Sequence, residues 1–578
     1  MRSTTVSRLL AALLPLVSPQ GVSAAVTCTN KFTVVTAANA IKALHPGWNL
    51  GNTLDAVPDE GSWNNAPATP ALLSQIKARG FKSIRIPVTW AYHFDTASPS
   101  WTVNPTFMTR VETVVDQALA AGFNVVLNVH HDSWVWADQT VAGANTTMIL
   151  EKFTSLWSQI GTKFACKSSS LIFEAINEPT GSTQAHGDLL NKMNANFLDV
   201  INKAGGFNPQ RVVSLSGLGQ DILKTTQFFK RPTTYPNQPW AIQFHYYSPY
   251  DFIFSAWGKT IWGSDADKAT LEADFDMLHG NFSGVPAFIG EWDASVSSTE
   301  VAARWKYNDF FIKTTNKYGY SAIIWDNGDD QYNRTAAFWK DPVGIDVLFN
   351  AAAGKANALA DSTTDINAAS QNTSAYLWHK VGAAVTDVEV PYILNGNKLS
   401  GVKDSKGKTL SSSDYTMSSA GVLKLSKSYL STLYSATTKP GAIATLTLSF
   451  SASPNLTLQV YQFATPILPS SSSTYSLNSL NAAVDLHIPI TYQGLPKVAA
   501  IRALREDGSI LVDDWTQYLG PLQKGRMTYG DWGFDDKGLT VWAAGVAKLK
   551  ASGGQGVRVL VEFWPRWEGN SVEVRFTV

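Results

Sequence analysis

Two glutamates in this 578-residue sequence stand at the ends of short apolar stretches, and together they indicate a chemistry. Glu178 follows a stretch of strand length, residues 171–176, which begins with three apolar residues, and precedes Pro179, which cannot continue a β-ladder. Glu291 follows a second apolar stretch, residues 287–289. One such glutamate alone is more often a solvated turn residue. A pair at two strand ends is typical of retaining glycoside cleavage, in which one carboxyl is the acid/base and the other the nucleophile.

An arginine in the middle of another apolar stretch needs a partner. Arg85 is that residue, and an unpaired guanidinium is very costly to bury. Glu174 and Glu291 are its candidate partners, and pairing with Glu174 alone would make Arg85 purely structural. Asn177, beside Glu178, has an amide that can donate two hydrogen bonds to a ligand.

Imidazole and aromatic side chains occur at the ends of further stretches. His245 is expected to position Glu178, and Tyr247 to donate a hydrogen bond to Glu291. The indole of Trp325 could form a floor beneath a sugar, because flat rings combine an apolar face with a polar edge. Each alone is more often a core aromatic, but together they predict a lined cleft. The predicted substrate-binding residues are Arg85, His130, His131, Trp134, Asn177, His245, Tyr247 and Trp325.

His130 and His131 bear on whether the protein binds a metal ion. Consecutive residues of a strand point to opposite faces of the sheet, so these two imidazoles are poor joint ligands. No other spacing typical of a metal site is found in the sequence. We therefore expect no metal ion and no cofactor.

These residues require a scaffold that brings strand ends together. Between residues 46 and 381, stretches of strand length alternate with amphipathic stretches of helical length. The predicted strands are 47–51, 83–88, 124–129, 171–176, 212–215, 241–246, 286–289 and 322–325. This alternation predicts an α/β fold, a (β/α)8 TIM barrel with its site at the C-terminal ends of the strands. An open doubly wound sheet is the alternative, but no Gly-rich phosphate loop follows the first strand.

The pattern changes after residue 381. Short alternating runs with Asn-Gly and Pro-Gly turns over residues 387–463 predict a small β-sandwich, and residues 466–476 form a Pro/Ser-rich linker. The predicted divisions are a signal peptide at 1–24, the catalytic barrel at 25–384, an immunoglobulin-like β-sandwich at 385–465, and a linker with a C-terminal β-sandwich at 466–578.

Tryptophan is frequent, with 20 in the chain, and several fall in the last module. A sandwich of about 100 residues has room for one or two core tryptophans, so at least two should be exposed. Trp542 lies in an apolar run and is expected in the core. Trp532, with Trp564 or Trp567, is expected to stack on a glycan. Packing of these rings against a neighbouring domain is the alternative.

Composition and the N-terminus bear on compartment and partners. Lys+Arg and Asp+Glu are equal at 46 each, so no strong field favours nucleic acid or a membrane surface. Residues 1–24 have the pattern of a secretory signal peptide, which predicts a secreted, extracellular protein; we also expect a monomer. Cys28 and Cys166 either form one bridge or remain separate thiols. Five acceptor triplets fit a glycoprotein: Asn145, Asn281, Asn333, Asn372 and Asn455.

The ordered set of candidate residues resembles glycoside hydrolase family 5. The set is Arg85, His130, Asn177-Glu178-Pro179, His245-X-Tyr247, Gly290-Glu291 and Trp325, and the likeness covers the whole predicted barrel. The family implies Glu178 as acid/base, Glu291 as nucleophile and no cofactor. Trp292-Asp293 follows the nucleophile where many members carry Phe-Gly, so the neighbouring subsite is expected to differ.

Two segments, residues 47–56 and 245–249, resemble the endo-β-1,4-glucanase branch of the family. The tail resembles the immunoglobulin-like spacer and the family 46 carbohydrate-binding module of some bacterial members. We therefore expect a secreted retaining endo-β-1,4-glucanase whose partner is a β-glucan polysaccharide. The same machinery acting on xyloglucan, mixed-linkage glucan or mannan is the alternative, and a non-catalytic cell-wall carbohydrate-binding protein is the rival from another class.

Overall fold

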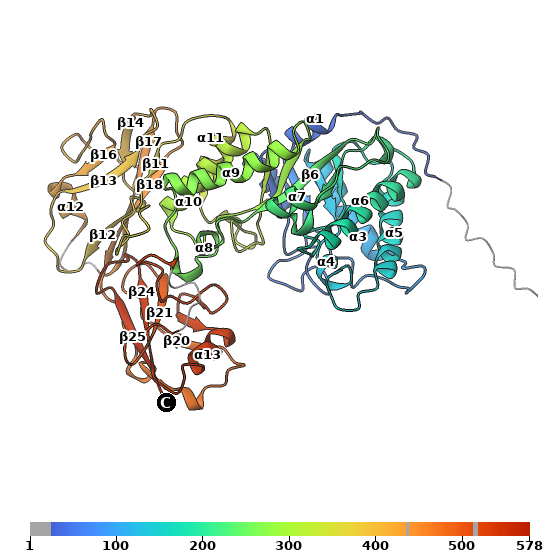
Figure 1. The fold of residues 1–578 in the computed structure, drawn as a ribbon. Helices are drawn as coiled ribbons and strands as arrows, with labels where there is room; N and C mark the ends of the chain where they lie inside the picture. The colour runs from blue at the N-terminus through green and yellow to red at the C-terminus, as the bar shows by residue number, and fades with distance from the viewer. Residues whose placement is uncertain (1–24, 435–438, 512–517) are drawn as a thin grey trace, which may run out of the picture.

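The computed structural model describes residues 25–434, 439–511 and 518–578, so the predicted signal peptide lies outside the described residues (Figure 1). Eight parallel strands form a closed barrel in the order β1 to β8, which confirms the predicted fold. They are β1 Gly47–Asn49, β2 Ser83–Ile86, β3 Asn124–Asn128, β4 Leu171–Glu174, β5 Val213–Ser216, β6 Trp240–Tyr246, β7 Ala287–Trp292 and β8 Ser321–Ile324. Each overlaps a predicted strand.

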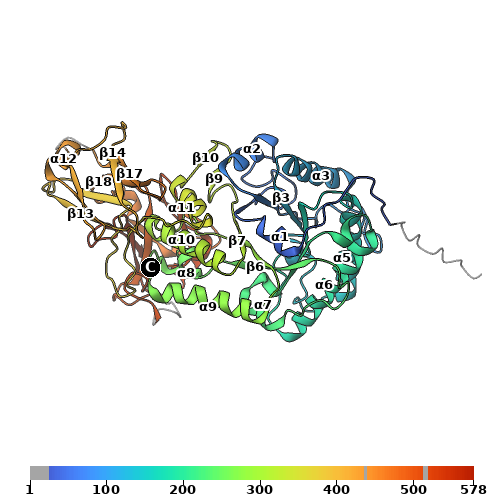
Figure 2. The same cartoon turned by 90° about the horizontal axis from the view of Figure 1, so that it is seen from above.

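Helices follow the strands and surround the barrel, as Figure 2 shows from above. In α2, Pro70–Arg79, Thr69 accepts a hydrogen bond from the Leu72 backbone, Pro70 begins the helix and Gly80 ends it at a positive φ of 120°. The other helices of this unit include α3 Pro105–Ala120, α4 Asp132–Val135, α5 Thr146–Lys163, α6 Gln184–Ala204, α7 Ile222–Phe228, α8 Tyr250–Ile253, α9 Asp265–Asn281, α10 Val301–Lys317 and α11 Pro342–Ala352.

A short helix, α1 (Ala37–Lys42), closes the end of the barrel at which the strands begin. Its buried Ile41 and the following Leu44 pack in one apolar cluster with side chains of the barrel strands, among them Ile172 and Phe288. The opposite end, where the strands finish, is therefore the open one. Function in barrels of this kind is located at that open end.

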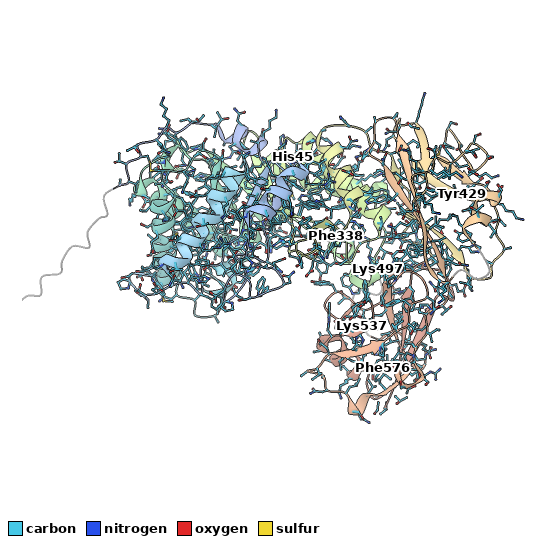
Figure 3. All side chains as sticks on the ribbon, turned by 180° about the vertical axis from the view of Figure 1, so that it is seen from behind. His45, Phe338, Tyr429, Lys497, Lys537 and Phe576 are labelled. Carbon is cyan, nitrogen blue, oxygen red and sulfur yellow. A yellow bond between two sulfur atoms is a disulfide. The ribbon has the colours of Figure 1, made fainter. Side chains whose placement is uncertain are left out.

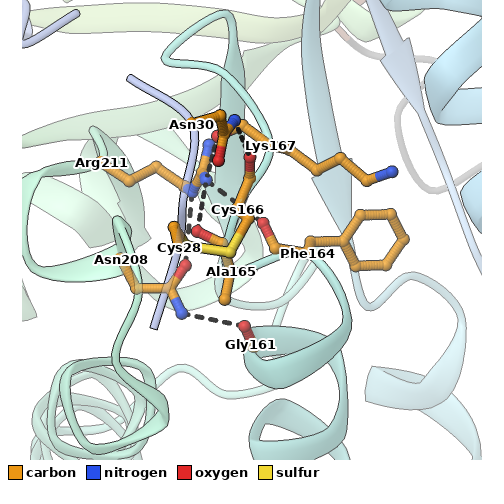
Figure 4. Close-up of a disulfide and its surroundings, with 9 residues drawn as sticks. All are labelled: Cys28, Asn30, Gly161, Phe164, Ala165, Cys166, Lys167, Asn208 and Arg211. Carbon is orange, nitrogen blue, oxygen red and sulfur yellow. Dashed lines mark hydrogen bonds between the residues drawn. A yellow bond between two sulfur atoms is a disulfide. The ribbon is translucent and has the colours of Figure 1, made fainter. Parts of the chain in front are cut away.

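One disulfide holds the segment before α1 against the barrel. Cys28 and Cys166 are bonded, with their Cα atoms 5.4 Å apart, which decides between the two possibilities that the sequence left open. Figure 4 shows Arg211 beside the bridge, where it donates hydrogen bonds to backbone carbonyls that include those of Phe164 and Lys167. The bridge and this arginine together fix the end of the segment that follows α5.

The second module is a sandwich of two four-stranded sheets. One has the order β11 (Leu359–Ala360), β13 (Val388–Ile393), β16 (Val422–Leu425), β15 (Tyr415–Met417), and the other the order β12 (Tyr376–Lys380), β18 (Leu456–Phe463), β17 (Gly441–Phe450), β14 (Leu399–Lys403). Helix α12, Lys427–Leu433, follows β16. Because β11 and β12 precede the predicted boundary at 384, we propose that the barrel unit ends near residue 355.

The core of the second module continues into the barrel. Ala302 and Trp305 of α10, with Val343 and Val347 of α11, belong to the same buried cluster as the sandwich residues. Two domains that share one apolar cluster cannot move apart without exposing it to water. The second module is thus fixed to the barrel by its own core.

The third module has its own apolar core between a four-stranded and a three-stranded sheet. The sheets have the orders β19 (Thr474–Ser476), β25 (Ser571–Thr577), β24 (Val557–Phe563), β21 (Val498–Arg505) and β20 (Leu486–Pro489), β23 (Gly538–Val541), β22 (Trp532–Phe534), with helix α13, Ala543–Lys550. Figure 1 shows it below the second module and beside the barrel segment around α8. The prediction of two β-sandwich domains after the barrel is confirmed.

None of the helices in the described part of the chain combines the length and the apolar character needed to cross a bilayer.

Candidate active site

Strand register brings the polar residues of the sequence patterns into one layer. Asn49 of β1 pairs with Arg85 of β2, and Asn128 of β3 pairs with Glu174 of β4. On the other side of the barrel, His245 of β6 pairs with Glu291 of β7. All lie toward the carboxyl ends of their strands, the open end of the barrel.

Arg85 is completely buried and bonds to both of its predicted partners. Its Nε and Nη2 donate to the two carboxylate oxygens of Glu174 at 2.7 and 2.8 Å, and its Nη1 donates to Oε1 of Glu291 at 2.6 Å. Nη1 and Nη2 also reach Oδ1 of Asn49 and of Asn177, at 3.0 and 2.7 Å. Burial disfavours the charge, but the neighbouring carboxylates outweigh burial and raise the pKa of Arg85. The guanidinium stays charged and holds one oxygen of Glu291.

Glu291 has both oxygens engaged. Tyr247 donates its hydroxyl to Oε2 at 3.0 Å, while Arg85 bonds to Oε1. Burial, and then the charge of Glu291, raises the pKa of Tyr247, so the phenol remains a donor. The sequence placed Glu291 beyond the end of its strand, but β7 continues to Trp292. The register shifts at Phe244/His245, which lets β7 carry an extra residue and still place Glu291 beside His245.

Glu178 lies opposite, in the loop after β4. Its Oε1 is 2.7 Å from Nδ1 of His245, and its side chain is 26% exposed. Its backbone has a positive φ of 37°, unusual for a residue with a side chain, and its backbone N–H donates to Oε1 of Gln220 at 2.8 Å. One carboxylate oxygen of Glu178, one of Glu291 and a ring nitrogen of His245 all lie within 4.8 Å of one another.

Four residues that support this site were absent from the predicted set: Glu174, Asn128, Gln220 and Asn49. Glu174, already held by Arg85, accepts further hydrogen bonds from Asn128 at 3.1 Å and Gln220 at 3.3 Å. Burial alone would raise the pKa of Glu174, but the charge and hydrogen bonds of Arg85, followed by His245 and the hydrogen bond from Asn128, lower it. Asn49 supports the site by accepting a hydrogen bond from Arg85. A polar residue ending a buried strand is a usable signal for Asn49 and Asn128, whereas Gln220 comes from a loop and leaves no such signal.

An aromatic wall at this end of the barrel is formed by His130, His131, Trp134 and Trp325, whose rings contact one another in sequence. The rings of His130 and Trp325 are parallel, 5° between planes with centroids 6.1 Å apart, and His131 stacks on Trp134 at 5.0 Å. Trp134 donates its indole N–H to the backbone carbonyl of Glu178 at 3.3 Å. Burial lowers the pKa of His130 well below its usual range, so it is a neutral hydrogen-bonding group.

The expectation that His130 and His131 face opposite ways is wrong. Their ring centroids are 4.5 Å apart. The reason is that β3 ends at Asn128, so the alternation of a strand no longer applies to them. Within the described residues, two groups bring three possible ligand atoms within 4.8 Å: Asp55, His130 and His131, and Glu178, His245 and Glu291. The expectation of no metal therefore stays a prediction; in the second group Glu291 already accepts hydrogen bonds from Arg85 and Tyr247, and His245 is bonded to Glu178.

The tryptophans of the third module divide between two places. Trp532, Trp542 and Trp564 line a cavity of about 520 Å³ whose other wall is barrel residues such as Phe254 and Val296. Trp564 is only 5% exposed and Trp542 is half-buried, so the expectations of a surface Trp564 and a core Trp542 are both wrong. Both rings line this cavity between the third module and the barrel.

Trp567 lies elsewhere. It is 39% exposed and packs on Phe463 of the second module, with 72° between the ring planes. Trp532 is half-buried, as a ring at the wall of a cavity should be. The predicted binding of glycan by Trp532 and Trp567 stays a prediction. Trp532 lines the same cavity as Trp564, whereas Trp567 does not line that cavity.

Comparison with known proteins assigns a family. The family model described as "Cellulase (glycosyl hydrolase family 5)" matches residues 47–331, the span of the barrel and this site. "Endoglucanase B" of Paenibacillus lautus is 30% identical over 497 residues, which cover 83% of this chain and 82% of that protein. The chain belongs to glycosyl hydrolase family 5. This family 5 protein is therefore a glycoside hydrolase, as the sequence predicted.

Solved structures extend the likeness to all three modules. A tri-modular GH5 (subfamily 4) endo-β-1,4-glucanase from Bacillus licheniformis is 33% identical with a TM-score of 0.82, covering 94% of this chain and 100% of that one. A tri-modular endo-β-1,4-glucanase from Bacillus halodurans is 25% identical with a TM-score of 0.78 over 94% and 100%. These relatives support the predicted endoglucanase activity.

A second family model, "Carbohydrate binding domain X2", matches residues 371–460. This is the sandwich that the sequence indicated as an immunoglobulin-like spacer. A carbohydrate-binding domain is thus present in the tail of this family 5 enzyme. The family 46 assignment of the third module stays a prediction.

Proposed function

We propose that the protein is a secreted, retaining endo-β-1,4-glucanase that hydrolyses cellulose or related β-glucans by double displacement. The observation that carries the proposal is the separation of Glu178 and Glu291, which have one carboxylate oxygen each within 4.8 Å of one another. Retaining enzymes hold their carboxyl groups about 5–5.5 Å apart, whereas inverting enzymes need about 6.5–9.5 Å to admit a water.

In the first step Glu178 gives its proton to the glycosidic oxygen and Glu291 attacks the anomeric carbon. The bond to the leaving sugar breaks and a glycosyl-enzyme forms. Arg85 and Tyr247 hold one oxygen of Glu291 each, so the nucleophile is oriented before substrate arrives. In the second step Glu178, now ionised, takes a proton from water, which attacks the same carbon and releases the sugar with its original configuration.

His245 links the two carboxylates during this exchange. Its Nδ1 lies 2.7 Å from Oε1 of Glu178 and 3.7 Å from Oε2 of Glu291. The same ring nitrogen, Nδ1, faces both groups. In one tautomer Nδ1 donates to ionised Glu178, and in the other it accepts from protonated Glu178, so the hydrogen bond is kept in both states. It positions the acid/base and does not need to supply the proton itself.

The remaining cleft residues are proposed to bind sugar. The amide oxygen of Asn177 accepts from Arg85, so its nitrogen is the end left to donate to a 2-hydroxyl. Trp325 would support the sugar at the point of cleavage. His130, His131 and Trp134 would contact the neighbouring sugar along the aromatic wall.

Two separate observations support secretion. Residues 1–24 have the pattern of a signal peptide, and the Cys28–Cys166 bridge is of a kind that persists in oxidising compartments. We propose an extracellular monomer; mass spectrometry of the protein recovered from culture medium would show whether the chain begins near residue 25 and whether its sequons carry glycans.

Two measurements test the proposed function. Reducing-sugar release from carboxymethylcellulose and barley β-glucan is expected to exceed that from mannan, with xyloglucan as the arm that reveals tolerance of side chains. Proton NMR in the first minutes of hydrolysis is expected to show the β-anomer first. Early α-anomer would overturn double displacement, and no hydrolysis of any polymer would favour the non-catalytic alternative.

A further inference from the structure

A cavity of about 650 Å³ lies between the second and third modules, apart from the catalytic cleft. The second module contributes Tyr376 and Trp378 of β12 and Glu389 of β13, the segment before β12 contributes residues such as Ser362, and the third module contributes Trp567. Its size falls in the range of small-ligand sites, roughly 300–1,000 Å³. No residue of the catalytic site lines it.

One wall of this junction cavity is aromatic. Tyr376 and Trp378 stack on each other, with centroids 4.9 Å apart and 20° between planes. Trp567 makes a T-shaped contact with Phe463, and such a contact covers at most one face of an indole. A second face therefore remains available to a flat, partly apolar ligand such as a pyranose ring.

The rest of the lining is polar and carries an unsatisfied group. Ser362 is 8% exposed and its hydroxyl has no hydrogen-bond partner among the described residues. A buried hydroxyl without a partner costs about 1–3 kcal/mol, which a ligand that offers a donor or acceptor would recover. Asp361 and Glu389 add carboxylates that accept hydrogen bonds from hydroxyl groups.

We propose that this junction cavity is a non-catalytic binding site for a segment of β-glucan chain. Sugars combine an apolar face for the indoles with hydroxyls for Ser362 and the carboxylates. The carboxylates disfavour an anionic ligand, and a quaternary ammonium has no hydrogen-bonding group for Ser362. The choice of β-glucan among glycans rests on the proposed function; the choice of a glycan rests on the cavity.

The test is calorimetric titration of the full chain carrying Glu291→Ala, which prevents turnover, with cellohexaose. Two classes of site are expected, the cleft and the junction cavity. Trp567→Ala should weaken one class about five-fold or more, since a single stacking contact contributes on the order of 1–3 kcal/mol. Trp567→Tyr, which keeps a flat ring, should retain most of that affinity.

Ser362→Ala supplies an arm that does not depend on the packing of Trp567. Because its hydroxyl has no partner, the melting temperature should not fall, while the same class of site weakens several-fold. Ser413→Ala, an exposed serine on the same module that bonds only to Ser411, is the matched control and should change neither. In the otherwise wild-type chain, hydrolysis of an aryl cellobioside should be unaffected by all four substitutions.

Unchanged titrations for both Trp567→Ala and Ser362→Ala would overturn the site. Mannohexaose is the second probe. If the second class of site appears with mannohexaose and not with cellohexaose, and is lost in both variants, the cavity binds a glycan but β-glucan is overturned as its ligand. Failure of the proposed function appears separately, as wild-type protein that does not hydrolyse β-glucan.

Discussion

The catalytic layer of the barrel and the junctions of the third module are organised by different forces. In the barrel, each functional side chain stands on a strand or next to one, and Arg85 alone connects Glu174, Glu291 and Asn177. At the junctions, rings from separate modules meet across cavities of about 520 and 650 Å³. The first site is fixed by backbone hydrogen bonds of one sheet, and the junctions by how the third module docks on the barrel and the second module.

Polar anchors hold the docked third module. Arg566 donates to the carbonyl of Gly258 and the hydroxyl of Thr260, both at 2.8 Å. Lys497, which Figure 3 shows where the barrel approaches the third module, lies 3.4 Å from the carbonyls of Val296 and Thr299. The barrel site and the junctions thus differ in how far they are pre-organised, and substitutions in each region measure that difference.

The largest effect is expected from removing the proposed nucleophile. Glu291→Ala should lower turnover of an activated aryl glycoside by roughly three orders of magnitude or more, because no covalent intermediate can form. Azide, which fits the space left by the carboxylate, should restore turnover and give an α-glycosyl azide. Near-normal activity of Glu291→Ala without azide would show that the barrel layer has been assigned wrongly.

Arg85→Met should harm both stability and activity. It leaves Glu174 and Glu291 buried without their cation, and breaking a buried ion pair from one side costs about 3–5 kcal/mol. The measurement is the free energy of unfolding in urea beside kcat on the aryl glycoside. Adding Glu174→Gln should recover part of the stability but little activity, because Glu291 still lacks its partner. Full activity in Arg85→Met would reduce Arg85 to a structural role.

At the junction, Trp532→Ala should act on polymer only. One stacking contact contributes about 1–3 kcal/mol, so binding of β-glucan or xyloglucan should weaken several-fold while an aryl cellobioside is hydrolysed as before. Trp564→Ala differs, because this ring is buried and its loss should cost about 3–5 kcal/mol of stability. Equal polymer activity in wild type and Trp532→Ala would make the ring structural.

The smallest effect concerns pH at the same junction. Burial, with the charge of Arg304, lowers the pKa of Lys497 to about 7, while Glu300 opposes the shift. Between pH 7 and the usual pKa of about 10.5 the unfolded chain binds more protons, so stability should rise with pH over this window. Lys497→Met should flatten that rise. Parallel melting temperatures of the two proteins from pH 6.5 to 9.5 would contradict it.

The same contrast explains what the sequence could predict. The barrel strands and the two carboxylates were predictable because the spacing of apolar residues and the polarity of strand ends are local properties of the chain. The resemblance to the family then suggested the roles of the carboxylates. Gln220 was missed because a loop residue acquires its position only from the fold. Trp542 and Trp564 were assigned wrongly because their burial depends on the surface against which the third module docks, which no local pattern encodes.

The loop after α8 has a consequence for how the chain can be divided. The hydroxyl of Thr260 meets both Arg566 and Gln371, so one short barrel segment joins the end of the chain to the segment before β12. A barrel expressed without residues 466–578 would present the Gly258 carbonyl, Thr260 and the wall of the cavity to water. Engineered catalytic fragments of this enzyme therefore need a redesigned surface there, and swapping tails between relatives requires exchanging this loop with its two partners.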